Sequence, residues 1–261
     1  MIIPLIITSL VVGITLLYAS WLDIQDRRVP FRTWYPMLVI GIPFVVFFYA
    51  NLVLVSPSLF LRFVVITALF CGFFYFFAAI HLFGGADAWA LIFIAALIPV
   101  FPVQPYFDYS PLQFFPFTVL TNAVILNLAT PLGIFIMNVG RKNFAPFPYM
   151  FFGFPVPGDR VEQYFGFVME EINEHEGGLT RRFVTVRESL STMVRGGDRL
   201  YTKDIRLHPE QYTKERALFK KAGYIWISYG VPFILPITAG FFTALLAGDI
   251  LYTVMRMAIG V

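Results

Sequence analysis

The sequence predicts an all-α polytopic membrane protein, with six transmembrane helices and a small, mainly helical insertion between the fifth and the sixth. Of the 261 residues, 58% are hydrophobic and only 13% are charged, whereas a soluble domain carries about a quarter charged residues. The apolar residues gather in six runs, and most of the charged residues lie in one segment. This composition excludes a water-soluble globular protein, a disordered chain and a nucleic-acid-binding module.

The six apolar runs are the predicted membrane spans, because a transmembrane helix needs about 20 mainly apolar residues. The fourth run is short and ends among prolines. The first is expected to remain in the mature protein, since nothing basic precedes it and arginines follow it, unlike in a cleavable signal peptide. The predicted spans cover residues 2–22, 34–55, 61–83, 88–103, 114–139 and 222–247.

Residues 141–221 form the predicted solvated insertion, since they hold 14 of the 19 basic and 11 of the 16 acidic residues. Apolar side chains recur at helical spacing over 161–172 and over 183–194, and 209–221 is expected to be a charged helix that leads straight into the sixth span. The expected domains are therefore 1–140 with the first five spans, 141–221 as a cytoplasmic insertion, and 222–261 with the sixth span and the C-terminal tail.

The positions of the basic residues predict the orientation in the membrane. Arg27, Arg28 and Arg32 follow the first span, and the 14 basic residues of the insertion follow the fifth, whereas only Arg62 and Arg256 lie on the opposite side. Cytoplasmic loops are enriched in Lys and Arg. Both termini are therefore expected outside the cell membrane, with the insertion in the cytoplasm.

Two carboxylates are expected at one membrane depth, near the cytoplasmic face. Asp23 ends the first span and Asp87 begins the fourth. Two carboxyl groups about 3 Å apart cannot both ionise cheaply, so one keeps a proton and the pair divides into acid and base. Such a dyad hydrolyses amides without a metal or a covalent intermediate. Alternatively, Asp87 is only a helix N-cap and Asp23 a charge that reaches the headgroups.

The local sequence favours the functional interpretation. Asp87 ends the motif Gly84-Gly85-Ala86-Asp87, in a turn of about four residues between two spans. Successive glycines allow close backbone approach and positive φ, which a turn beside a peptide substrate needs. Asp23 is followed by a basic segment that ends at Pro30, where proline directs the chain out of the helix.

These two segments, in this order and at the ends of spans one and four, resemble the prepilin peptidase family of membrane aspartic proteases, in particular its archaeal branch of preflagellin peptidases. That family has an Asp followed by a basic, Pro-terminated loop, and then a Gly-x-Gly-Asp motif near the start of span four. The resemblance implies that Asp23 and Asp87 are the catalytic pair. It also places Gly84, Gly85 and Ala86 in the motif, with Ala86 instead of its second glycine.

Three further features bear on activity. Trp89 stands where many members of the family have Lys, and Phe31 where many have Asn after the proline, which affects substrate preference. Bacterial relatives carry two Cys-x-x-Cys pairs and also methylate the new N-terminus. Because Cys71 is the single cysteine of the sequence, we expect peptidase activity without methyltransferase activity, and no metal or cofactor.

The resemblance also implies the partners: the lipid bilayer, and preflagellin or prepilin substrates with a short basic leader, a small residue and a hydrophobic helix. Asp26, Asp159 and Glu162 are candidate ligands for the leader's Lys or Arg, with the insertion holding or gating the leader. The rival hypothesis is a small ion- or proton-coupled transporter, in which Asp23 and Asp87 are exchange sites. It is disfavoured because the sequence has no internal repeat and both aspartates lie at one face.

Overall fold

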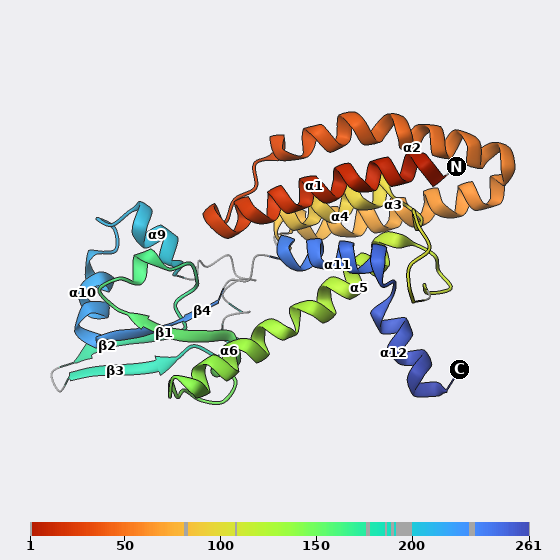
Figure 1. Cartoon of the computed structure of the whole chain (residues 1–261). Helices are drawn as coiled ribbons and strands as arrows, with labels where there is room; N and C mark the ends of the chain where they lie inside the picture. Colours follow the sequence, from red (N-terminus) through yellow and green to blue (C-terminus); the bar gives the residue numbers. More distant parts are fainter. Residues whose placement is uncertain are drawn as a thin grey trace. The chain divides into compact units, whose positions relative to one another are not determined.

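The computed structural model describes residues 2–80, 83–107, 109–175, 178–185, 187–188, 191, 200–229 and 233–260. The contacts divide the chain into two units (Figure 1). The first unit contains Met1–Leu128 and Pro232–Val261, and the second contains Ala129–Val231.

The first unit is helical, and its longest helices are long and apolar enough to cross a membrane. Ser56 is extended and separates two long helices, and Pro57 begins the second of them, a position at which proline costs no hydrogen bond. A 3₁₀ turn, η1, covers Phe31–Trp34. The helices are α1 (Ile2–Asp26), α2 (Tyr35–Val55), α3 (Pro57–Ala79), α4 (Gly85–Leu97), α5 (Phe115–Asn127), α11 (Ile234–Leu246) and α12 (Ile250–Ile259).

The described helices include four that are long and apolar enough to cross a membrane. The helices α11 and α12 bend by 58° at a short break, and they make a fifth candidate if the bent pair is one span. The four candidates without such a bend are Ile3–Asp26, Phe31–Val55, Pro57–Ala79 and Phe115–Gly140, the last of which contains α5 and the following helix α6. The chain is therefore a polytopic membrane protein, and the count of six spans stays a prediction because α4, with 13 residues, is short for a span.

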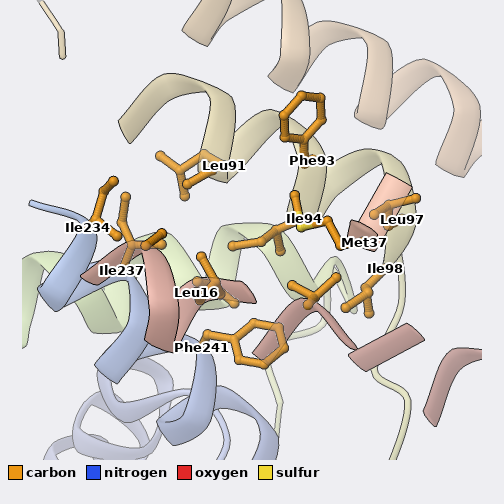
Figure 2. Close-up of a cluster of buried hydrophobic side chains, with 14 of the residues drawn as sticks. Leu16, Met37, Leu91, Phe93, Ile94, Leu97, Ile98, Ile234, Ile237 and Phe241 are labelled. Atoms are coloured by element: carbon orange, nitrogen blue, oxygen red, sulfur yellow. The ribbon is translucent and has the colours of Figure 1, made fainter. Parts of the chain in front are cut away.

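The short helix α4 lies at the centre of the first unit and contacts α1, α2, α3, α5 and α11. Leu91, Ile94 and Leu97 of α4 are completely or almost completely buried. Figure 2 shows these side chains together with Leu16 of α1 and Ile237 of α11 in one apolar cluster. Lipid tails are as apolar as these side chains, so the cluster is stabilised by close packing rather than by removal from water.

A buried polar cluster holds the bend between α11 and α12 against α5. The side-chain amide of Asn122 donates to the Gly248 carbonyl at 2.8 Å, and its oxygen accepts from the Ile250 N–H at 3.1 Å. Asp249, the N-cap of α12, accepts from the Tyr252 N–H at 3.0 Å. These bonds satisfy the backbone groups that the break in the helix leaves free, which is a requirement inside a membrane.

Gly240 lets α11 approach the backbone of α5. A Cβ atom at this position would lie 2.6 Å from the Val119 carbonyl oxygen and 2.7 Å from the Ala123 nitrogen, and these backbone atoms cannot move aside easily. We therefore expect Gly240→Ala to destabilise the protein by about 1–3 kcal/mol, as overpacking does, and to lower the melting temperature in detergent. Gly72→Ala is the matched control, because a Cβ there meets no described atom within 4 Å. Equal melting temperatures of the two variants would contradict the close approach.

The described residues of the second unit form two antiparallel strand pairs. In these, β1 (Gly153–Pro157) pairs with β4 (Tyr224–Ser228), and β2 (Glu170–His175) pairs with β3 (Gly178–Phe183). Its apolar core includes Val156, Ile205, Phe219, Ile225 and Ile227. Its other elements are α6 (Ala129–Gly140), α7 (Tyr149–Phe152), the 3₁₀ turn η2 (Val161–Gln163), α9 (Thr202–Leu207) and α10 (Thr213–Ala222).

The expectation of a mainly helical insertion is wrong for the described part of this segment. Instead of a helix over 161–172, the turn η2 ends at Gln163 and strand β2 begins at Glu170. Strand β2 buries Glu170 together with Ile172, and the Arg181 guanidinium pairs with the Glu170 carboxylate at 2.7 Å. A buried charged residue conceals the two-residue alternation from which a strand is predicted. Half of the residues of the expected helix over 183–194 lie outside the described residues.

The charged helix expected over 209–221 is present as α10, but it does not lead into the sixth span. Gly223, with φ +78°, ends α10, and strand β4 follows. The next described helix, α11, begins only at Ile234. The predicted span over 222–247 includes the apolar run of β4, but its residues Ile225, Trp226 and Ile227 are buried in the second unit. A short apolar run in a sequence is compatible both with a buried strand and with the start of a membrane span.

Candidate active site

Asp87 lies in the first turn of α4, directly after the chain leaves the glycine turn. Gly84 is the N-cap of α4, and the carboxyl group of Asp87 folds back over it, so that a Cβ atom at Gly84 would collide with Asp87 Oδ2. At Gly85 a Cβ meets no described atom within 4 Å, and Ala86 packs against the apolar core. Space for the carboxyl group therefore explains Gly84 but not Gly85.

The expectation of positive φ at these glycines is wrong. Gly84 has φ −61° and ψ 131°, and Gly85 is the first residue of α4. Neither belongs to the described glycines with positive φ. The turn needs a residue without a Cβ atom at position 84 because of the Asp87 side chain, not because of a left-handed backbone.

Asp23 lies in the last turn of α1, and the residue that ends this helix also faces it. Arg27 has a left-handed backbone (φ 53°), and its N–H donates to the Asp23 carbonyl at 3.1 Å. The Arg27 guanidinium interacts electrostatically with the Asp23 carboxyl group. The sequence indicates only a membrane-face role for Arg27, because the left-handed residue that ends α1 is not the glycine from which such a turn is predicted.

The fold brings Asp23 and Asp87 together from different parts of the chain. Both side chains are half-buried, and their carboxyl groups are near enough to interact electrostatically. The backbone N–H of Ile234, at the start of α11, also interacts with the Asp87 carboxyl group. Three helices thus contribute to the site, and the third was not expected from the sequence, because a backbone N–H leaves no signature in the residue type.

This arrangement of side chains can support acid–base catalysis. Two neighbouring carboxyl groups can divide into a proton donor and a proton acceptor. The N-terminus of α11 and the Arg27 guanidinium place positive charge beside the pair, which stabilises its remaining negative charge. Among the residues that the structure describes, no three His, Cys, Asp or Glu side chains gather as ligands of a metal ion would.

Two aromatic residues named in the sequence analysis lie against each other. Phe31 contacts Trp89 edge to face, with ring centroids 5.3 Å apart, and Trp89 stacks on Phe93 at 5.2 Å. The two positions at which the resemblance implies a departure from the family pattern are therefore in contact with each other.

The three candidate leader ligands do not form a described cluster. Asp26 is the exposed last residue of α1 in the first unit. Asp159 and Glu162 belong to the second unit, where Asp159 pairs with Arg160 at 3.9 Å and Glu162 with Arg216 at 3.2 Å. A leader side chain would have to displace these existing ion pairs.

Comparison with known proteins identifies relatives over nearly the whole chain. The family model described as "Type IV leader peptidase family" matches residues 10–138, and the model "Archaeal Peptidase A24 C-terminus Type II" matches residues 145–250. A preflagellin peptidase of Methanocaldococcus jannaschii is 24% identical over 253 residues, which cover 93% of this chain and 94% of that protein. A preflagellin peptidase of Methanococcus voltae is 25% identical over 249 residues, which cover 90% of this chain and 92% of that protein.

Proposed function

Since this chain belongs to the type IV leader peptidase family, in its archaeal preflagellin and prepilin branch, it is a peptidase, and we propose that it removes the leader of such precursors with an Asp23–Asp87 dyad. The observation that carries the proposal is that these two carboxyl groups, which α1 and α4 supply from separate parts of the chain, are near enough to interact electrostatically. The alternative that Asp87 is only a helix N-cap is wrong, because Gly84 is the N-cap of α4, and a membrane-edge role of Asp23 does not require this interaction.

In the proposed reaction the two carboxyl groups have opposite protonation states. The ionised one accepts a proton from water while the water oxygen attacks the scissile carbonyl carbon. The protonated one donates a hydrogen bond to the carbonyl oxygen, where negative charge develops. The proton that the first carboxyl group accepted from water is then transferred to the leaving amide nitrogen as the C–N bond breaks. No step of this reaction requires a metal or a covalent intermediate.

We propose that the dyad acts at the cytoplasmic face of the cell membrane, with both termini outside and residues 141–221 in the cytoplasm. The basic segment with Arg27, Arg28 and Arg32 directly after α1 supports this orientation. A basic leader on the cytoplasmic side would then meet the dyad where the hydrophobic helix of the substrate enters the membrane, and Asp26, Asp159 and Glu162 are each candidate ligands for its Lys or Arg. The proposal includes no methyl transfer, since Cys71 lies within α3 and no second cysteine exists in the sequence.

A cleavage assay with the purified full chain in detergent tests this function. The substrate is a synthetic peptide with a Lys- and Arg-rich leader, a glycine and an apolar helix, and mass spectrometry identifies the products. We expect one cut after the leader, slower cleavage when the leader's basic residues are replaced by Gln, and no methylated product when a methyl donor is added. An intact peptide, together with Asp-dependent proton flux in liposomes, would favour the transporter hypothesis instead.

A further inference from the structure

Two buried hydroxyl groups connect α1 and α11 near the aspartates. Ser20 Oγ and Thr238 Oγ1 lie 2.7 Å apart, and the two residues are 4% and 3% exposed. The other buried hydroxyl groups of α1 donate only to carbonyls one turn back in the same helix. These are the hydroxyls of Thr8, Ser9 and Thr15. Ser20 differs from them because its partner belongs to another helix.

The residues of the hydroxyl pair are linked to both aspartates through α1 and through the first turn of α11. Ser20 precedes Asp23 by three residues on α1, so the two side chains lie on neighbouring parts of one helix face. Thr238 is within hydrogen-bonding distance of the Ile234 carbonyl, at 2.8 Å, and of the Leu16 carbonyl, at 3.3 Å. Ile234 is also the residue whose N–H interacts with Asp87. The first turn of α11 is thus bonded to the turn of α1 that precedes Asp23.

We propose that Ser20 and Thr238 are positioning residues, which set the axial register of α1 against α11 and thereby hold Asp23 and Asp87 at their working separation. This inference rests on the proposed peptidase function. The two hydroxyl groups can bond to each other in one register of α1 against α11 only, and such interhelical hydrogen bonds contribute to helix association in a membrane. The opposite face of α11 is held by the contact of Gly240 with α5, so that α11 can serve as a fixed reference for α1.

The test compares variants that remove the hydroxyl group with one that keeps it. Thr238→Val preserves the shape of the side chain, and Ser20→Ala removes the same bond from the other helix. We expect each to lower kcat about 10–100-fold with little change in KM, since small misplacements of reacting groups have effects of this size. Thr238→Ser is expected to restore most of kcat. The double variant should be no slower than the slower single variant, because both remove the same bond.

Thr15→Val is the matched control, since the Thr15 hydroxyl donates to the Val11 carbonyl within α1 at 2.9 Å and is expected to leave kcat unchanged. The melting temperature of every variant and the pH profile of kcat are measured together. A purely structural pair would lower the melting temperature but leave kcat and its pH profile unchanged, and this result overturns the inference. A wild-type chain that does not cleave overturns the proposed function itself, whereas a cleaving wild type with a fully active Thr238→Val overturns the positioning role alone.

Discussion

Replacing either Asp23 or Asp87 by asparagine is expected to abolish cleavage while the protein remains folded. The amide has nearly the same shape as the carboxyl group, but it can neither accept the proton of the attacking water nor donate one to the substrate. Loss of a general acid or base typically lowers the rate by about 10²–10⁴-fold. Because the two groups act as one unit, we expect the double variant to be hardly slower than either single variant.

Cleavage rates of the purified variants, measured beside their melting temperatures, provide the test. Asp249→Asn is the matched control, because Asp249 is a buried carboxyl group of the same unit that caps α12, and asparagine is an equally good N-cap. The control should retain activity. Substantial cleavage by Asp23→Asn or by Asp87→Asn would refute the dyad. An equal loss of activity in the Asp249→Asn control would show that the carboxyl groups are needed for folding rather than for catalysis.

The variant Gly84→Ala is expected to lose most activity without loss of stability. Its new methyl group would occupy the position of Asp87 Oδ2, and the carboxyl group of a flexible side chain can rotate away at small cost. That rotation separates the carboxyl group from Asp23 and from the substrate. We expect kcat to fall about 100-fold, as for a displacement of about 1 Å in a catalytic group, with an unchanged melting temperature.

Gly85→Ala provides the comparison within the same motif. A Cβ at Gly85 meets no described atom, and alanine favours helix over glycine at this first position of α4. We expect it to retain activity within about threefold, since no catalytic group is displaced. If both substitutions were equally harmful, the requirement would be for backbone flexibility in the turn, and the steric account of Gly84 would be incorrect.

Much of the helical part is predictable from the residues alone. The expected spans over 34–55 and 61–83 correspond to α2 and α3 within a few residues, because long apolar runs have few alternatives in a chain of this composition. The second unit was less predictable. Its strand β2 buries Glu170 against Arg181, and its strand β4 is an apolar run that resembles the start of a span.

The two aspartates and their glycine turn are visible in the sequence because their chemistry depends on side-chain type and order along the chain. The partners of the aspartates are not visible there. Arg27 faces Asp23 only because a left-handed residue ends α1, and the Ile234 N–H faces Asp87 only because α11 packs between α1 and α5. Local composition decides which segments become apolar helices, whereas the groups that surround a charge depend on packing between segments that are distant in the sequence, here α1, α4 and α11.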